Sequence, residues 1–141
     1  QIEINEIQDH VNLEISDHVL FTLGSAELKP EGLNLLQQLA TIVNSTKLNI
    51  SVEGHTDNVP INNTHFPSNW ELSTARATTV TRHLIDNNIA PSRIRAIGYA
   101  DTHPRADNDT EQGRERNRRV SIILHMPDAD AQENTIAGFS D

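Results

Sequence analysis

Apolar and polar residues alternate along four stretches of this chain, a period-two pattern typical of strands with one buried face. The last stretch is the most regular, and the side chains that share its apolar face are those of Val120, Ile122, Leu124 and Met126. The pattern predicts four strands, at residues 11–15, 48–53, 93–99 and 119–126.

Two longer stretches instead place apolar residues three and four positions apart, the spacing of a helix with one buried face. The first begins at Pro30, a residue preorganised for the first helical position, and ends near residue 44. The second begins at Ser68, where Ser68 and Glu71 match a capping box, and it ends near residue 87. A third, short helix is expected over about residues 111–117, directly before the last strand.

These elements, in this order, predict an α/β (α+β) two-layer sandwich of the form β-α-β-α-β-(α)-β, with two long helices packed on one face of a four-stranded mixed sheet. Residues 18–23 are expected to form a short strand or an apolar loop. Residues 1–10 could be a strand, a helix or a linker, so we take 1–10 as an N-terminal extension and 11–126 as the domain. The acidic tail, 127–141, has too little apolar content to fold alone and is expected to be disordered.

Charge and composition limit the choice of partners. The net charge of −9 argues against nucleic acid, and without cysteine the chain has neither a disulfide framework nor a thiolate metal site. Four arginines nevertheless fall within residues 114–119; they either pair with Glu111 and Glu115 on a solvated face or bind a small anionic or zwitterionic ligand. The chain starts at Gln1 and has no apolar run near the roughly 18 residues of a membrane span. We therefore expect a fragment of a larger protein whose anchor or export signal lies upstream.

Enzymatic chemistry finds little support in the sequence. No glycine-rich phosphate loop is present, and no nucleophile and base stand at a catalytic spacing. The seven histidines are dispersed, so a metal site built from His55 and Asp57 with His65 or His103 is disfavoured. We expect no metal, no cofactor and no catalysis.

Arg76 is the exceptional residue of the second long helix. It occupies the one position in an i, i+4 row where an apolar residue is expected, the other members being Leu72, Val80 and Leu84. An arginine beside a buried seam needs an anionic partner, because an unpaired charge there is costly. That partner could be Asp57, as an internal ion pair that holds the loop to the helix. It could equally be a zwitterionic ligand held by Asp57, Asn69, Arg76 and the arginines before the last strand, and the residues alone favour neither.

Five motifs in order resemble those of the OmpA-like C-terminal domain, a peptidoglycan-binding module, over about residues 11–126. They are Phe21-x-x-Gly24-Ser25-Ala26-x-Leu28-x-Pro30, Val52-Glu53-Gly54-His55-Thr56-Asp57, Leu72-Ser73-x-x-Arg76-Ala77, Ile97-Gly98-Tyr99 and Asn117-Arg118-Arg119-Val120. Within that family, residues 66–73 and the long loop before them resemble the flagellar stator B subunits (MotB or the sodium-type PomB). The outer-membrane porin and the Pal lipoprotein have a shorter loop here.

The resemblance implies a site for diaminopimelate, the zwitterionic residue of the peptidoglycan stem peptide. Arg76 would hold its carboxylate, and Asp57 with the turn amides would complete the grip. The other residues carried over from the family are Thr56, Asn69, Asn117, Arg118 and Arg119.

The function that the resemblance implies is a non-catalytic anchor that fastens a membrane-embedded ion channel to the cell wall. It would be a homodimeric periplasmic domain of a single-pass inner-membrane protein, whose upstream part meets a stator A subunit (MotA or PomA type), with flagellar basal-body ring proteins as further candidate partners. The alternatives are an envelope-stabilising anchor of the OmpA or Pal type and, less favoured, a cell-wall hydrolase. Wall binding could also require that residues 1–30 first rearrange.

Overall fold

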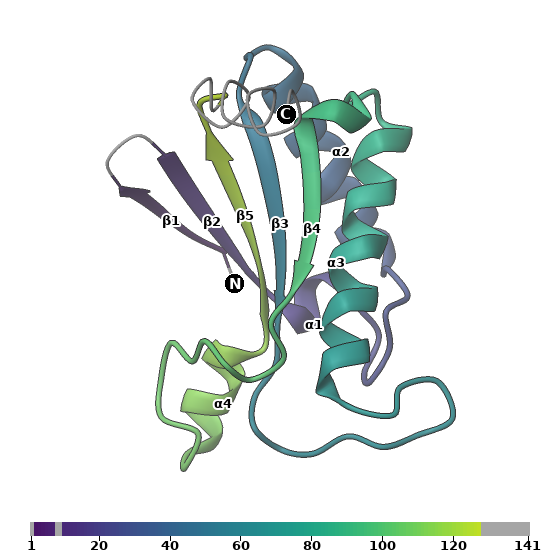
Figure 1. The fold of residues 1–141 in the computed structure, drawn as a ribbon, viewed down its shortest axis with the longest axis vertical. Coiled ribbons are helices and arrows are strands. Elements are labelled where there is room, and N and C mark those ends of the chain that lie inside the picture. Colours follow the sequence, from purple (N-terminus) through teal and green to yellow (C-terminus); the bar gives the residue numbers. More distant parts are fainter. Residues whose placement is uncertain (1, 8–9, 128–141) are drawn as a thin grey trace, which may run out of the picture.

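The computed structural model, which describes residues 2–7 and 10–127, is a five-stranded sheet with two long helices against one face (Figure 1). The strands are β1 (Ile2–Ile7), β2 (His10–Ser16), β3 (Asn49–His55), β4 (Ile94–Gly98) and β5 (Arg119–His125). The helices are α1 (Asp17–Leu20), α2 (Pro30–Asn44), α3 (Asn69–Asp86) and α4 (Glu111–Asn117), with a 3-10 turn at Pro91–Arg93. The predicted fold class is confirmed.

The sheet is mixed, with strand order β1-β2-β5-β3-β4. Only β3 and β4 run parallel, whereas β5 is antiparallel to both β2 and β3, and β1 is antiparallel to β2. The sheet has one strand more than the four predicted, because residues 2–7 pair along β2, with Ile4 opposite Leu13. The predicted tail lies outside the described residues from 128 onward.

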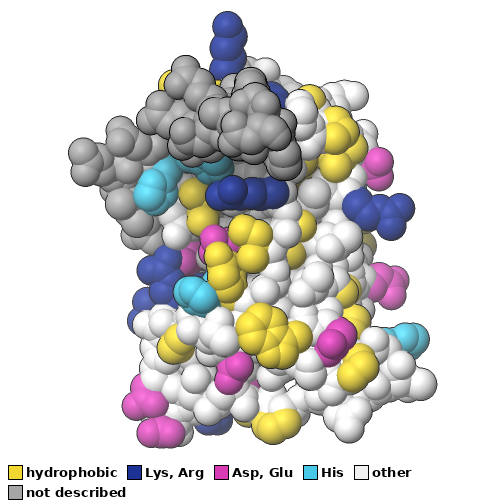
Figure 2. Space-filling view, viewed as in Figure 1, with side chains coloured by type: hydrophobic (Ala, Val, Ile, Leu, Met, Phe, Trp, Pro, Cys, Tyr) yellow, Lys and Arg dark blue, Asp and Glu magenta, His cyan; other side chains and the backbone are white. Residues whose placement is uncertain are grey.

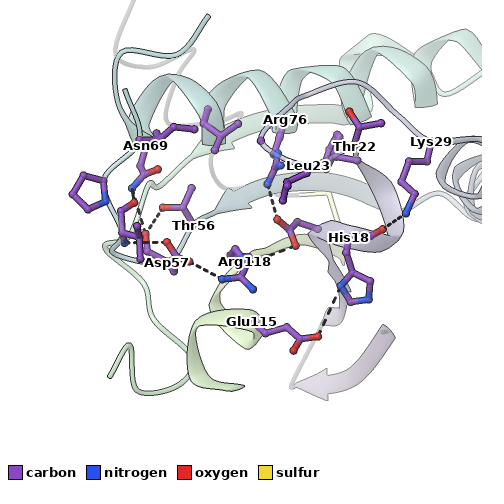
Figure 3. Close-up of a pocket in the computed structure, with 17 residues that line it drawn as sticks. His18, Thr22, Leu23, Lys29, Thr56, Asp57, Asn69, Arg76, Glu115 and Arg118 are labelled. Atoms are coloured by element: carbon purple, nitrogen blue, oxygen red, sulfur yellow. Dashed lines mark hydrogen bonds and ion pairs between the residues drawn. The ribbon is translucent and has the colours of Figure 1, made fainter. Parts of the chain in front are cut away.

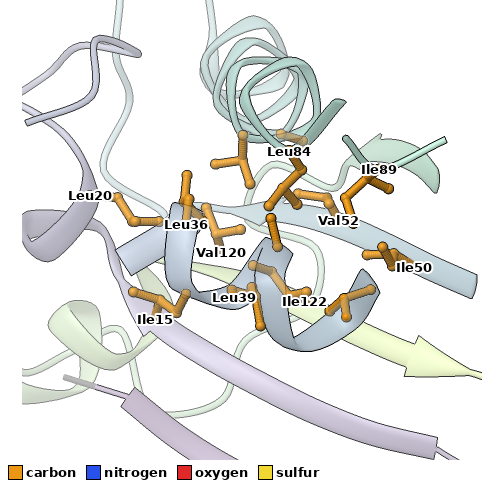
Figure 4. Close-up of a cluster of buried hydrophobic side chains, with 14 of the residues drawn as sticks. Ile15, Leu20, Leu36, Leu39, Ile50, Val52, Leu84, Ile89, Val120 and Ile122 are labelled. Carbon is orange, nitrogen blue, oxygen red and sulfur yellow. The ribbon is translucent and has the colours of Figure 1, made fainter. Parts of the chain in front are cut away.

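The hydrophobic core fills the space between the sheet and the two long helices (Figure 4). Alternate residues of the strands supply one side of it, and the apolar stripes of α2 and α3 supply the other. The most deeply buried members include Ile15, Leu20, Leu36, Ile50, Val52, Val80, Leu84, Val120 and Ile122. The predicted apolar row of α3 is therefore confirmed as a core face, with Arg76 buried among it.

Residues 18–23, expected to be a short strand or an apolar loop, divide between a helical turn and a loop. Residues 18–20 belong to α1, whereas Phe21 forms an isolated antiparallel bridge with Leu28 and residues 22–23 are loop. The chain makes one helical turn, α1, in which the amide of Phe21 donates to the carbonyl of Asp17 at 2.8 Å. The amide of Asp17 donates in turn to the carbonyl of Arg118 at 3.0 Å, which fixes α1 beside the start of β5. A single turn is too short to show helical periodicity, and its burial of Leu20 and Phe21 gave the apolar run that resembled a strand.

Gly54 allows the end of β3 to lie directly against α3. A Cβ atom at this position would lie 2.1 Å from the carbonyl oxygen of Ser73, so only glycine fits there without moving the helix. The close approach brings the first turns of α3 to the end of β3, and with them Arg76 towards Asp57.

Several helices and a long loop lie together at one end of the sheet, where the candidate site is found. Figure 1 shows α1, α4 and the start of α3 at this end, together with the long loop of residues 56–68 that connects β3 to α3. On the face seen in Figure 2, acidic side chains lie at the end that holds α4 and also along the side where α3 lies. Within the described ranges, no helix is both long and apolar enough to cross a bilayer.

Candidate functional site

A cavity of about 840 Å³ opens at this end of the molecule, between α1, the loop after it, the loop after β3 and the start of α3 (Figure 3). Its floor is charged and much of its wall is apolar. The residues that line it are Asp17, His18, Phe21, Thr22, Leu23, Gly24, Lys29, Thr56, Asp57, Val59, Pro60, Ile61, Asn69, Leu72, Arg76, Glu115 and Arg118.

Asp57 follows directly after β3 and is 8% exposed. One carboxylate oxygen, Oδ1, accepts a hydrogen bond from the amide of Val59 at 3.0 Å, which is an Asx turn that shapes the start of the loop. The other, Oδ2, accepts from Nη1 of Arg118 at 2.7 Å. The carboxylate is thus held in place at the edge of the cavity.

Arg76 has Asp17 as its carboxylate partner, so the internal Asp57–Arg76 pair considered from the sequence is wrong. Nη1 of Arg76 donates to Oδ2 of Asp17 at 3.0 Å, and Nε donates to the carbonyl of Ser25 at 2.8 Å. The guanidinium also lies over the ring of Phe21, 4.8 Å from its centroid. Burial lowers the pKa of Arg76 and Asp17 opposes that shift, so an arginine with so high an intrinsic pKa stays charged.

Arg118 connects the two carboxylates. Besides its bond to Asp57, its Nε lies 3.9 Å from Oδ1 of Asp17, and its Nη2 donates to Glu111 at 2.8 Å. Burial lowers the pKa of Arg118, but the hydrogen bonds that Arg118 donates to Glu111 and Asp57 outweigh this effect, and the pKa is raised. The cavity floor is therefore an alternating row of charges, Arg76–Asp17–Arg118–Asp57, which we call the charge row.

The cavity lining is balanced in charge. Leaving His18 aside, three acidic residues (Asp17, Asp57 and Glu115) face three basic ones (Lys29, Arg76 and Arg118). A neutral ligand that carries both signs of charge can meet such a floor without leaving an uncompensated charge behind. A polyanion would leave the acidic residues of the floor without a partner of opposite charge.

Thr56 and Asn69 hold the loop that forms the cavity wall. The Thr56 hydroxyl donates to the carbonyl of Asp57 at 2.8 Å, and the Asn69 amide donates to the carbonyl of Val59 at 3.0 Å. Asn69 is the first residue of α3, after the predicted cap Ser68, whose hydroxyl oxygen accepts from the amide of Trp70. Both residues line the cavity.

Asn117 and Arg119 lie behind the cavity and do not line it. The fully buried Asn117 side chain accepts from the amides of Arg105 and Ala106 and donates to the carbonyl of Ala106. Arg119 is buried on the sheet face away from α2 and α3, where it pairs with Glu14 at 3.6 Å. Nη2 of Arg119 also donates to the carbonyl of His103 at 3.0 Å, so the contacts of both residues fit a structural role in holding the loop before α4.

For the four arginines of residues 114–119, the sequence left two interpretations open: ion pairs on a solvated face, or binding of a ligand. The structure gives different arginines different surroundings. Arg114 and Arg118 both pair with Glu111, as expected of a solvated face. Arg118 also reaches into the cavity, and Arg119 is buried. Among the described residues, no group of three metal-ligating side chains converges.

Asp17 is the site residue that sequence reasoning missed. It is the only acidic residue between Glu14 and Glu27, and it stands four positions before Phe21 of the first motif. That spacing was the available signal, but Asp17 and Arg76 are 59 positions apart in the sequence, which concealed the pair.

The sequence pattern of the OmpA family matches residues 20–118, which hold every residue of the charge row except Asp17. Motility protein B of Bacillus subtilis is 35% identical over 136 residues, covering 95% of this chain and 52% of that protein. The uncharacterised protein YtxE of Bacillus subtilis is 42% identical over 115 residues, covering 81% of this chain and 48% of that protein. The chain thus spans about half the length of these curated relatives.

Solved structures agree with the sequence comparison. The cell wall anchor of the T6SS from Pseudomonas aeruginosa superposes with a TM-score of 0.85 at 36% identity, covering 89% of this chain and 88% of that one. The periplasmic domain of Helicobacter pylori MotB superposes with a TM-score of 0.84 at 26% identity, covering 97% of this chain and 89% of that one. From the family match over most of the chain and from these relatives, the chain belongs to the OmpA family.

Proposed function

We propose that this domain binds peptidoglycan without cleaving it and anchors a flagellar motor stator to the cell wall, by recognising diaminopimelate in the stem peptide. The observation that carries the proposal is the charge row on the cavity floor. Diaminopimelate presents an ammonium and a carboxylate at the end of its side chain, and both signs of charge alternate along this row.

The contacts of the charge row suit such a ligand. A guanidinium can grip a carboxylate through two parallel hydrogen bonds, which makes Arg76 and Arg118 the groups to receive the ligand carboxylate. Asp57 is the natural acceptor for the ligand ammonium, because its carboxylate is fixed by Val59 and Arg118 at the cavity edge. The carbonyls of the loop after β3 would complete the site.

The assignment to a stator rests on the relatives rather than on the cavity. Two of the similar proteins carry the name Motility protein B or MotB, and none of the names reported above describes hydrolysis. A stator role would place the domain in the periplasm as part of a homodimer, with a stator A subunit and basal-body ring proteins as partners of the whole protein.

Co-sedimentation with purified sacculi that contain diaminopimelate tests the binding proposal. Wild-type protein should pellet with the sacculi, whereas Asp57→Asn and Arg76→Lys should stay largely in the supernatant. Arg82→Gln is the matched control, because Arg82 is exposed on α3 away from the cavity lining. Circular dichroism must show that each variant is folded, and equal pelleting of the folded variants would refute the site.

Soluble peptides test the ligand. A stem tetrapeptide with diaminopimelate should compete with sacculi for the domain. The same peptide with lysine in that position, which lacks the side-chain carboxylate, should compete poorly. Equal competition by both peptides would exclude diaminopimelate as the recognised group.

A cell-wall anchor of another assembly is the second candidate, favoured by the 36% identity to the T6SS anchor over 89% of this chain. Both candidates predict binding to sacculi, so the binding assay does not separate them. Chromosomal replacement by the Asp57→Asn form does: a stator predicts assembled but paralysed flagella, and an anchor of another assembly predicts normal swimming.

A further inference from the structure

The cavity is larger than the head group of one diamino acid requires. A volume of about 840 Å³ is in the range that encloses a drug-sized molecule. The charge row occupies one part of it, and the lining continues past Arg76 to a second group of polar residues around Lys29 (Figure 3). The remainder of the cavity has room for a further part of a ligand.

Lys29 supplies a cationic centre at this far end. Its ammonium donates to the carbonyl of His18 at 2.6 Å and lies 3.4 Å from the carboxylate of Glu31. The Glu31 side chain is 62% exposed, so this ion pair is weak and readily exchanged for another anion. An ammonium group has three N–H donors, so a ligand carboxylate can be bound while the bond to His18 is kept.

The stretch between the two ends is apolar. Leu23 stands at the tip of the loop after α1 and is fully exposed, and Figure 3 shows it between Arg76 and Lys29. Four further apolar residues line the cavity: Phe21, Val59, Ile61 and Leu72. A ligand that spans this stretch carries aliphatic groups between its charged ends.

We propose that the cavity binds two parts of one stem peptide: the zwitterionic side-chain end of the diamino acid at the charge row, and the free main-chain carboxylate at the peptide's C-terminus at Lys29. The aliphatic side chains between them pack against Leu23. This inference rests on the proposed function, and it adds that the domain prefers a trimmed stem peptide with a free carboxylate to one whose carboxylate is amidated or cross-linked.

The preference can be measured by titrating two soluble tetrapeptides, one with a free C-terminal carboxylate and one with a C-terminal amide, into each protein in a calorimeter. For wild type, the free acid should bind about fivefold more tightly than the amide, the value of a partly exposed ion pair. Lys29→Gln should bind the two peptides equally, at the affinity that wild type has for the amide. Lys29→Arg should keep the discrimination.

Lys47→Gln is the matched control. Lys47 is the only other lysine in the chain, is exposed, and follows the far end of α2 from Lys29. It should leave the ratio of the two affinities unchanged.

The possible results separate the two levels of the proposal. If wild type binds neither peptide, the proposed function itself fails. If wild type binds both peptides equally, or if Lys29→Gln weakens both by the same factor, peptidoglycan binding stands and the second carboxylate site is refuted.

Discussion

Arg76, the central cation of the site, is only 5% exposed, and its charge is compensated by the ion pair with Asp17. Removing one member of a buried ion pair leaves the other without compensation, which costs about 3 kcal/mol. Asp17→Asn should therefore lower the free energy of unfolding by about that amount, measured by urea denaturation. The loss is expected without any ligand present, because the pair is part of the folded state.

Glu31→Gln provides the comparison for that measurement. Its carboxylate also belongs to an ion pair, with Lys29, but it is mostly exposed, so its removal should cost less than about 0.5 kcal/mol. Similar losses from both substitutions would mean that Arg76 does not rely on Asp17.

We expect His55 to make the free energy of unfolding depend on pH. The ring is 4% exposed, its Nδ1 has no hydrogen-bond partner, and its Nε2 lies 3.1 Å from Glu53. It stacks on Tyr99, with His103 at its edge and the positive charge of Arg119 nearby. Burial lowers the pKa of His55 below 6.5, and this effect is larger than the rise caused by its hydrogen bond to the Glu53 carboxylate.

The sign of the pH effect follows from that shift. As the pH falls through 6.5, the unfolded chain takes up a proton at His55 before the folded protein does, so the free energy of unfolding falls. Urea denaturation at about pH 7.5 and about pH 5.5 should show this loss, and His55→Gln should reduce it. His65→Gln, at an exposed loop position, should lose as much unfolding free energy between the two pH values as wild type does. If His55→Gln also lost as much as wild type, the pH dependence would belong to other groups.

At the scale of elements, the contact of β3 with α3 decides whether Arg76 reaches the cavity. Gly54→Ala would place a methyl group 2.1 Å from the Ser73 carbonyl, and relieving that overlap requires the helix to move. Overpacking of this kind costs about 3 kcal/mol. We expect a matching drop in unfolding free energy and weaker sedimentation with sacculi, because the displaced helix carries Arg76.

Thr78→Ala is the control for this prediction, since Thr78 lies on the exposed side of the same helix. It should change stability by less than about 0.5 kcal/mol. Normal stability of Gly54→Ala would show that α3 can shift without loss.

The sequence predicted the elements that are long enough to display a period. The α2 and α3 helices and the strands β2 to β5 each contain several repeats of their spacing, and all were found near the expected bounds. The helix α1 was not predicted, because its four residues are too few to show a helical period. The pairing of β1 depends on its register with β2, which the weak alternation of residues 1–10 does not encode.

The ion pairs of the site could be predicted only in part, because they join residues that are far apart in the sequence. The i, i+4 position of Arg76 signalled that a partner was needed, and Asp57 was the nearest plausible residue in sequence. The partner is Asp17, which the antiparallel pairing of β2 with β5 and the turn of α1 bring to the same end of the sheet. Such contacts follow from the assembled fold and not from any local pattern.

At the scale of the whole molecule, the proposed function asks one cavity with a short charge row to hold a polymer under load, and we expect a single such site to bind it only weakly. Two domains held together gain through effective concentration, because the second binding event becomes intramolecular. We therefore expect a fusion of this domain to a parallel two-stranded coiled coil to reach half-saturation at a sacculus concentration at least about tenfold lower than the monomeric domain needs. The measurement is co-sedimentation over a range of sacculus concentrations.

A mixed dimer in which one copy carries Asp57→Asn separates avidity from any effect of the fusion itself. Its half-saturating sacculus concentration should return to the value of the monomeric domain. If the mixed dimer kept the full gain, the coiled coil would be strengthening one site rather than joining two, and the wall anchor would have to draw its strength from a single domain.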